Sequence, residues 1–298
     1  MADVATGTGG PQGTATARPR GRRPGPVALL ARQFRYQDLL FWRNPFAAFF
    51  TIVFPMMFLL LFNSLNGGTR LTELGGIRFA QFFTPSIMVF AAVSATYVNL
   101  ATSVAIARDD GILKRLRGTP MPAWVYVAGR VVQATWAAVL ASILMVLVGV
   151  LLFHVKLFWH LMPAAIVTLL VGTVSFCALG LALAAVCPNG ETAPAMANFT
   201  WLPVAFISPI FYPLNQAPQW LQTLGNVFPV KHFAQAMQAA FSPLTRGSGF
   251  RWGDLGVIAL WALGGAIVAT LRFQWEPRAV SGGRRRGRRS AVEAGGEE

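Results

Sequence analysis

The strongest constraint on this chain is the placement of its charged residues. Six long stretches contain no Asp, Glu, Lys or Arg at all: residues 46–69, 79–107, 131–155, 157–190, 192–230 and 255–271. A helix needs about 20 apolar residues to cross a bilayer core of about 30 Å, and each stretch holds a segment of about that length. A charge at the bilayer centre costs about 2.5–3.5 kcal/mol even on lenient scales. The sequence therefore predicts a polytopic membrane protein and excludes an ordinary soluble domain.

We expect an all-α membrane protein with six transmembrane helices. The third could begin earlier than its charge-free stretch, near Pro122, because residues 123–128 are also apolar. The six predicted spans are Phe46–Leu65, Phe82–Ala107, Val131–Phe153, Leu161–Cys187, Ala193–Pro213 and Leu255–Leu271.

The basic residues predict the orientation. With six spans both termini lie on one side, and that side holds 19 of the 25 basic residues. Cytoplasmic segments carry the excess of Lys and Arg, so we expect both termini in the cytoplasm and the chain in the plasma membrane. The net charge of +14 is then explained by topology and attraction to anionic membrane lipids, and a nucleic-acid partner is not expected.

Three regions are predicted along the chain. Residues 1–26 contain no apolar run and read as a disordered cytoplasmic tail. Residues 27–273 hold the six-span domain, and residues 274–298 form a basic cytoplasmic tail.

The sequence lacks the residues that nucleotide binding, metal binding and proton relay usually require. None of the three lysines follows a glycine, so the chain has no phosphate-binding P-loop. Cys177 and Cys187 lie too far apart in sequence for a structural zinc pattern, and we expect no metal or cofactor in this chain. No carboxylate lies well inside a predicted span, which disfavours a built-in proton relay but leaves backbone-coordinated sodium open. Energy for any transport is expected from another subunit.

Two short helices are predicted on the cytoplasmic side. Val27–Trp42 has an apolar stripe that includes Phe34 and Phe41, with Arg32 and Arg35 off it, which is typical of a helix in the membrane interface. Residues 108–120 form the second, in which Asp109 or Asp110 caps the start, basic residues fill the last turn, and Gly118 and Pro120 end it. Ile112, Leu113 and Leu116 would form an apolar knob that fits a partner's groove.

The segment between the last two spans, residues 214–253, is divided by prolines and has helical apolar spacing around Trp220 and Phe233. Irregular backbone at membrane depth must be covered by protein or face a water cavity. We therefore expect two short external re-entrant helices there. The proline-broken fifth span is the most irregular one, and we expect its Trp201, Phe206, Phe211 and Tyr212 to line a translocation path.

Three stretches carry a resemblance to a known family. They are Arg43-Asn44-Pro45 with Pro55, the loop from Asp109 to Pro120, and the run Ser208–Pro213 followed by Pro218-Gln219-Trp220-Leu221 and Phe228-Pro229. They resemble the permease subunits of type-2 ATP-binding-cassette exporters, a group that includes the daunorubicin-resistance permeases. The similarity runs from about residue 32 to residue 272.

The resemblance implies a permease dimer, homomeric or heteromeric, that works with a separate cytoplasmic ATPase subunit holding ATP and magnesium. It implies a bacterial exporter of a hydrophobic or amphipathic substrate such as a drug, lipid or glycolipid. The loop would be the coupling helix that docks on the ATPase, through Asp109, Asp110, Gly111, Leu113, Lys114, Arg115, Leu116 and Pro120.

Two other functions remain open. A membrane-embedded lipid-processing enzyme would use the Asp109–Asp110 pair, and its activity would depend on a metal. A non-transporting membrane anchor for a cytoplasmic complex would show no substrate efflux.

Overall fold

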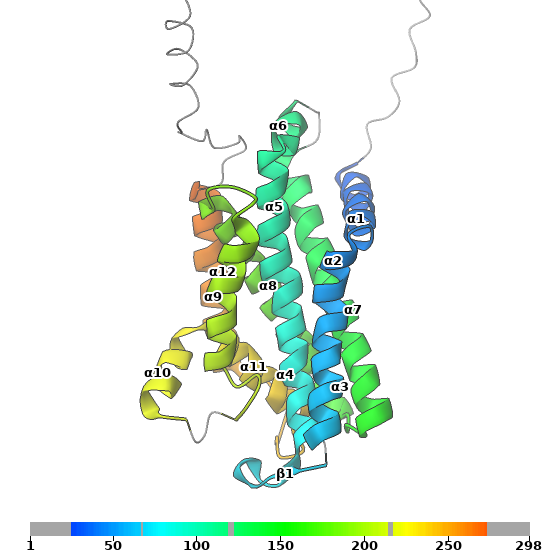
Figure 1. Cartoon of the computed structure of the whole chain (residues 1–298), viewed down its shortest axis with the longest axis vertical. Helices are drawn as coiled ribbons and strands as arrows, with labels where there is room; N and C mark the ends of the chain where they lie inside the picture. The colour runs from blue at the N-terminus through cyan, green and yellow to red at the C-terminus, as the bar shows by residue number, and fades with distance from the viewer. Residues whose placement is uncertain (1–24, 67, 119–121, 214–216, 273–298) are drawn as a thin grey trace, which may run out of the picture.

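The computed structural model describes residues 25–66, 68–118, 122–213 and 217–272. Its long helices run roughly along one common axis, whereas the short helices α10 (Gln219–Val227) and α11 (Pro229–Phe241) are tilted from it (Figure 1). Helices α1 (Pro26–Trp42) and α6 (Ile112–Arg117) lie at one end of the bundle, where α12 (Trp252–Arg272) also finishes. We call this the α6 end. The opposite end carries a small β-hairpin and is called the hairpin end.

Five helical stretches of the described chain are long and apolar enough to cross a membrane, with 22, 31, 30, 28 and 21 residues. The first consists of α2 (Pro45–Ala48), η1 (Phe49–Val53) and α3 (Phe54–Asn66). The second consists of α4 (Phe79–Val93), η3 (Ser94–Val98) and α5 (Asn99–Asp109). The others are α7 (Ala123–Phe153), the turn η4 (Trp159–Leu161) continued by α8 (Met162–Val186), and α12. The third stretch includes the apolar run after Pro122.

The predicted fifth span is shorter than expected. Helix α9 covers Ala193–Ile207, only 15 residues, and does not reach Pro213. At about 1.5 Å per residue such a helix is roughly 22 Å long, less than the bilayer core. It stops because Ser208 is extended, with a ψ of 157°, and the next residue is a proline, which disfavours helical backbone before it. The structure therefore supports five candidate spans and leaves the sixth unconfirmed.

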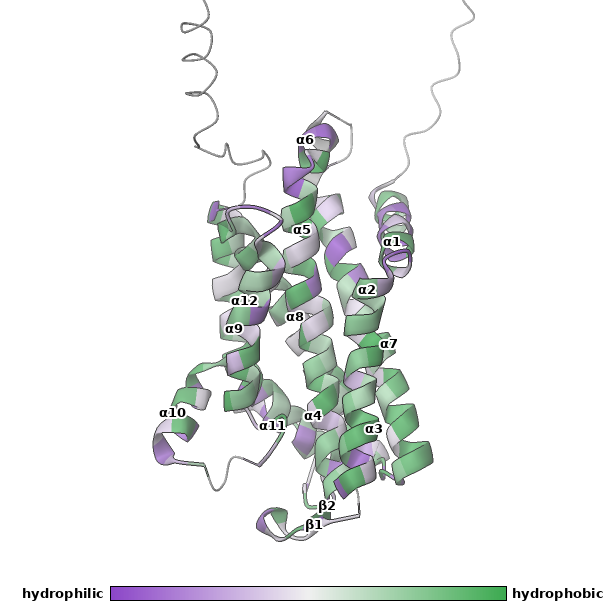
Figure 2. Cartoon of the chain, in the orientation of Figure 1, coloured by the Kyte–Doolittle hydropathy of each residue, from purple (hydrophilic) through white to green (hydrophobic). Residues whose placement is uncertain are grey.

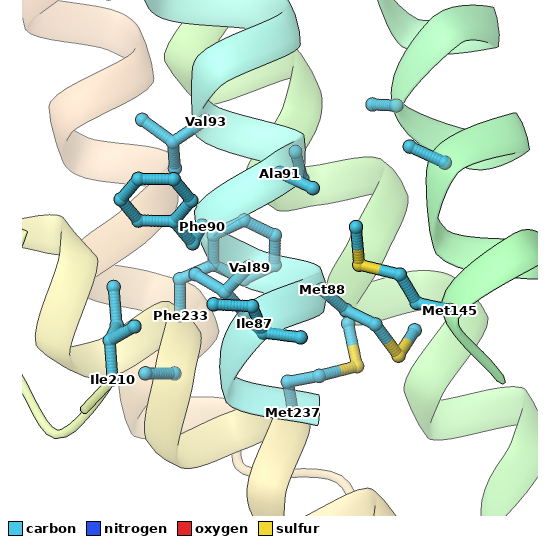
Figure 3. Close-up of a cluster of buried hydrophobic side chains, with 14 of the residues drawn as sticks. Ile87, Met88, Val89, Phe90, Ala91, Val93, Met145, Ile210, Phe233 and Met237 are labelled. Carbon is cyan, nitrogen blue, oxygen red and sulfur yellow. The ribbon is translucent and has the colours of Figure 1, made fainter. Parts of the chain in front are cut away.

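The core of the bundle is built around α4. Nearly all of its side chains are buried, and Phe83, Ile87, Val89 and Ala91 are completely so. Figure 3 shows Ile87, Val89 and Ala91 of α4 in one cluster with Met145 of α7 and with Phe233 and Met237 of helix α11 (Pro229–Phe241). Large apolar side chains are instead exposed on α7 and α12, where Leu151 is 64% and Leu260 is 68% exposed, and hydrophobic residues predominate along α3 and α7 (Figure 2). Such an apolar exterior suits a bilayer and not water, so the chain is an integral membrane protein.

The hairpin end departs from the all-α expectation. Strands β1 (Arg70–Leu71) and β2 (Ile77–Arg78) pair antiparallel around the turn η2 (Thr72–Leu74). Gly75 and Gly76 both have positive φ angles, which glycine adopts without a steric penalty. These two glycines turn the chain back between the first two spans, and two-residue strands are too short for an alternating pattern to predict.

Two helices follow α9. Helix α10 (Gln219–Val227) is mostly exposed, whereas α11 is mostly buried and packs on α4, α8 and α12. The carboxylate of Asp254, at the start of α12, lies 2.7 Å from the Nδ1 of His232 and forms an ion pair with Arg251. Burial lowers the pKa of Lys231, an effect that Asp254 opposes, and the Lys231 ammonium donates to the Asn226 side chain at 2.6 Å. These bonds tie α10, α11 and α12 together.

Candidate functional site

A cavity of about 1110 Å³ opens between the first two spans and runs from the α6 end toward the middle of the bundle. Its walls come from α1, the first span, the second half of the second span, the start of α7 and α9. Asp110 and Ile112, at the turn into α6, also line it. The cavity and the loop predicted to bind a partner are therefore parts of one region.

Both long helices that face the cavity change their winding where they border it. Segments η1 and η3 are π-helical and contact each other, and they contribute Phe50, Thr51, Ser94 and Val98 to the lining. A π-helical turn inserts an extra residue into an α-helix and is frequent at functional sites. The two segments redirect the side chains on either side of the opening.

The two sides of the cavity differ in chemistry. The first span contributes Phe46, Phe50 and Phe54, while α5 and α9 contribute amides and hydroxyls, among them Asn99 and Asn198. Among the described residues, the charged side chains in the lining are Arg43, Asp110 and Arg130. The cavity can therefore hold a molecule with one apolar and one polar side.

Helix α1 forms part of the wall and packs on α7. The Gln33 side chain lies where a Cβ on Gly129 would be, 2.5 Å from it. Gln37 and Phe41 are buried, Phe34 is half-buried, and Arg32 and Arg35 are exposed. The packed face of α1 is the one toward α7, and it includes the polar residues Gln33 and Gln37 together with Phe41.

Arg108 joins α5 to the loop between α8 and α9. Its side chain is 3% exposed, and its guanidinium donates to the Ala184 and Cys187 carbonyls, both at 3.0 Å. These carbonyls end α8, where a positive charge also meets the negative end of the helix dipole. Asp109 pairs with Arg108 and accepts a hydrogen bond from the Gly190 N–H. Both carboxylate oxygens of Asp109 are thus engaged in holding this loop.

These contacts correct the predicted start of the coupling helix. Asp109 is the last residue of α5 and does not cap α6, and Asp110 follows it as the C-cap of α5. The chain turns at Gly111, whose φ is +68°, a left-handed conformation that costs other residues about 1–2 kcal/mol. Gly118, which we expected to end the helix, does not adopt the left-handed conformation that glycine often has at a helix C-terminus. The acidic pair serves the preceding helix because α5 continues farther than its charge pattern indicates.

The structure also changes the predicted contact face of α6. Leu113 is fully buried in this chain, so it is not available to a partner, whereas Ile112 is partly exposed and lies at the cavity. Lys114 and Arg115 are exposed. The Leu116 side chain and Pro120 lie outside the described residues. Among the described side chains of α6, Lys114 and Arg115 form the surface that faces away from the bundle.

The four predicted path residues separate into two groups. Trp201 lines the cavity and is 3% exposed, with its ring 5.5 Å from that of Phe90. Phe206, Phe211 and Tyr212 do not line it. Phe211 instead stacks on Phe206 at 5.0 Å and meets Phe90 at 5.7 Å, because the chain leaves the helical path at Ser208.

Sequence reasoning missed most of the cavity wall. Asn99, Thr102 and Ser103 line it together, and their i, i+3, i+4 spacing in an uncharged span was a signal of a polar helical face. Phe46, Phe50 and Phe54 of the first span recur at i, i+4 and i+8, which was a signal of a shared aromatic face, whereas the two π-helical turns had no such signal.

Several known transport proteins are similar in sequence to most of this chain. The model of the family described as ABC-2 type transporter matches residues 27–242. The inner membrane transport permease YadH of Escherichia coli strain K12 is 24% identical over 210 residues, which cover 70% of this chain and 76% of the relative. The daunorubicin resistance ABC transporter permease protein DrrB1 of Streptomyces coeruleorubidus is 27% identical over 208 residues, 70% of this chain and 71% of the relative.

Proposed function

Because the chain belongs to the ABC-2 type transporter family, whose model spans more than half of it, we propose that it is the permease subunit of an exporter driven by a separate ATPase. It moves a hydrophobic or amphipathic substrate outward across the plasma membrane of a bacterium, as a dimer with a second permease copy. Both of its termini lie in the cytoplasm, and ATP and magnesium are bound by the partner subunit.

One observation carries the proposal. The turn that leads into α6 contributes Asp110 and Ile112 to the wall of the cavity, while the outward face of α6 presents Lys114 and Arg115. A partner that pulls or pushes α6 would therefore act directly on the cavity. This juxtaposition supports the assignment of α6 as the coupling helix.

The Arg108–Asp109 contacts supply the mechanical link. Since Arg108 and Asp109 bond to the end of α8 and to Gly190, displacement of α6 would be passed to the loop before α9, and α9 carries Trp201 and Asn198 into the cavity. ATP binding can bias the permease only through contacts that differ between its inward- and outward-facing states. In our proposal, these contacts are the ones between α6 and the ATPase.

Reversal of the charge on α6 tests the proposal. We expect the double variant Lys114→Glu/Arg115→Glu to lose co-purification with the co-expressed ATPase subunit and to lose ATP-driven export, because both side chains point outward. The matched control is Arg78→Glu/Arg246→Glu, two exposed basic residues outside the cavity and α6, which should keep both activities. An α6 variant that still binds and stimulates the ATPase would refute the docking assignment.

A further inference from the structure

Helix α10 lies at the side of the bundle and is attached mainly by polar contacts. It packs on α9 and α11, and it lies beside the lower part of α9 in Figure 1. Of its nine described residues, Gly225 alone is buried, whereas Trp220 is 67% and Val227 is 56% exposed. Burial of apolar surface therefore contributes little to its attachment, and hydrogen bonds at its C-terminal end decide whether it stays in place.

Side chains of α11 and α12 bond to this end of α10, whose last carbonyls have no helical N–H to accept from. The Trp261 indole donates to the Val227 carbonyl at 2.9 Å, and the Nε2 of His232 lies 2.9 Å from the Asn226 carbonyl. The Lys231 ammonium donates to the Asn226 side chain at 2.6 Å. Asn226 is therefore held by two consecutive residues of α11, and one of them is a histidine.

Both ring nitrogens of His232 face groups that can only accept a hydrogen bond. Nε2 meets the backbone carbonyl of Asn226, and Nδ1 lies 2.7 Å from the carboxylate of Asp254. Because Asp254 also pairs with Arg251, its carboxylate is ionised and has no proton to donate. A neutral imidazole has one N–H, whereas an imidazolium has two. The observed geometry therefore requires the protonated ring.

Three charged side chains lie around this histidine: Lys231 of α11, and Arg251 and Asp254 at the start of α12. Helices α4, α8 and α9 also pack on α11. Within their described residues the one titratable side chain is Cys177, which belongs to another cluster with Leu100. Burial lowers the pKa of Lys231, and Asp254 opposes this effect, so Lys231 is the second group whose proton has to be tested.

Release of α10 would uncover the end of α9. A Cβ added to Gly225 would lie 3.2 Å from the Ile207 carbonyl oxygen, so α10 lies directly against the residue at which α9 ends. Helix α9 carries Trp201 and Asn198 into the cavity. A change at the C-terminal end of α10 therefore reaches the cavity wall through a single helix.

We propose that His232, Asp254 and the Asn226 carbonyl form a proton-controlled latch that holds α10 on the bundle. The imidazolium bridges the carboxylate to the carbonyl and keeps α10 docked against the end of α9. When the ring loses its proton, the Nε2 lone pair faces the carbonyl oxygen, and α10 is released.

The direction of the pH response follows from the proton count. The docked form binds one proton more than the released form, so docking weakens as the pH rises through the range in which histidine titrates, about pH 5 to 8. The hairpin end faces outward in the proposed orientation, so the external pH controls the latch. Only this sidedness rests on the proposed function.

Spin labels on α10 and α12 measure the position of α10. The variant Thr223→Cys/Ala259→Cys carries both labels at exposed sites, and Cys177 and Cys187 are buried. In the full chain in phosphatidylcholine nanodiscs, we expect one short distance near about pH 5.5 and a second, longer distance that grows toward about pH 8. The ratio of long to short should rise about tenfold, as for the loss of one charge-assisted hydrogen bond. An unchanged distribution overturns the proposal.

Three further variants assign the response to one side chain. His232→Gln should show the longer distance at every pH, because a neutral amide cannot donate from both of its ends. The matched control is His160→Gln, an exposed histidine in η4, which should respond like the wild type. Lys231→Met should also keep the response. A response that persists in His232→Gln, or that is lost in Lys231→Met while α10 stays docked, overturns the assignment to His232.

Right-side-out membrane vesicles show which compartment controls the latch. A change of the external pH alone should alter the distance between the labels, and a change of the internal pH alone should not. A response to the internal pH alone refutes the proposed orientation and leaves the latch intact, whereas a response to neither refutes the latch. Neither measurement needs the ATPase, so loss of the export assignment leaves the result unchanged.

Discussion

Arg108 illustrates how one charged side chain can be buried at the edge of a membrane domain. Its guanidinium bonds to two carbonyls at the end of α8 and to Asp109. Those carbonyls have no later helical N–H to accept from, so the charge and the helix end satisfy each other. The residue connects two loops at the α6 end of the bundle.

The variant Arg108→Met should therefore destabilise the protein by on the order of 2–4 kcal/mol, since it removes charge-assisted hydrogen bonds and leaves the Asp109 carboxylate without its cation. The apparent midpoint of thermal unfolding in detergent measures the loss. The exposed Arg35 provides the control Arg35→Met, which should melt like the wild type. Equal midpoints for the two variants would contradict the assigned role of Arg108.

Gly111 controls where α6 points. A Cβ there would meet no neighbouring atom, but the φ of +68° is disfavoured for any other residue. We expect Gly111→Ala to shift α6 and to reduce stimulation of the ATPase subunit several-fold, with normal insertion into the membrane. Gly111→Pro and Leu116→Asp should abolish ATP-driven export.

The control for this prediction lies seven residues later. Gly118 has no positive φ, and an added Cβ would approach only the Arg115 carbonyl, at 3.4 Å. Gly118→Ala should keep normal coupling, and a loss equal to that of Gly111→Ala would show that the backbone conformation at Gly111 is not the cause.

At the scale of elements, α1 is attached to the bundle by its contact with α7. The Gln33 Cβ lies 3.1 Å from the position of a Cβ on Gly129, close enough for a disulfide after slight adjustment. The same helix lines the cavity through Gln37 and Phe41. If export requires α1 to move relative to α7, a covalent link between them will stop it.

We expect the double variant Gln33→Cys/Gly129→Cys to form this disulfide on oxidation and to lose export until it is reduced. Cys177 and Cys187 are both buried and should not compete. Export and the extent of cross-linking are measured on the same vesicles. Full export by the oxidised variant would show that α1 and α7 stay together through the cycle.

At the scale of the whole molecule, both described ends of the chain, the start of α1 and the end of α12, lie at the α6 end of the bundle (Figure 1). This agrees with an even number of crossings, with α9 as the short one. Helix α9 runs beside α5, and a partner copy or a thinner local bilayer could cover the remainder of its path.

The predicted orientation can be measured with a membrane-impermeant thiol reagent on intact cells. Arg115→Cys on α6 should react only after the cells are opened, whereas Thr72→Cys in the exposed hairpin turn should react at once. The wild-type cysteines are buried and supply the unlabelled control. The opposite pattern would invert the proposed topology.

Much of the architecture could be predicted from the chain alone. The charge-free stretches predicted the long helices, because a charged side chain in the hydrocarbon core is costly and is therefore excluded from a membrane-spanning segment. The family followed from short motifs around Asn44, Gly111 and Pro209. The hairpin at Gly75 and the early end of α9 at Ile207 were not predicted, since both depend on single backbone conformations within otherwise apolar or mixed sequence.

The candidate site was predicted less well. Trp201 was expected at the path and lies in the cavity, but Phe211 and Tyr212 do not line it. Asp109 was expected to cap α6, and it instead pairs with Arg108 and Gly190. Gly190 is separated from Asp109 by 81 residues in sequence, and local propensity carries no information about such a pair.

The sequence by itself determined that this chain is a helical membrane protein, because the cost of burying charge acts on every residue independently of its neighbours. Its short motifs indicated the transporter family. Only the tertiary structure decided that the two π-helical turns, the amide-bearing face of α5 and the aromatic face of the first span enclose one cavity beside α6. Enclosure depends on the rotation and packing of helices distant in sequence, which are determined by many weak contacts acting together.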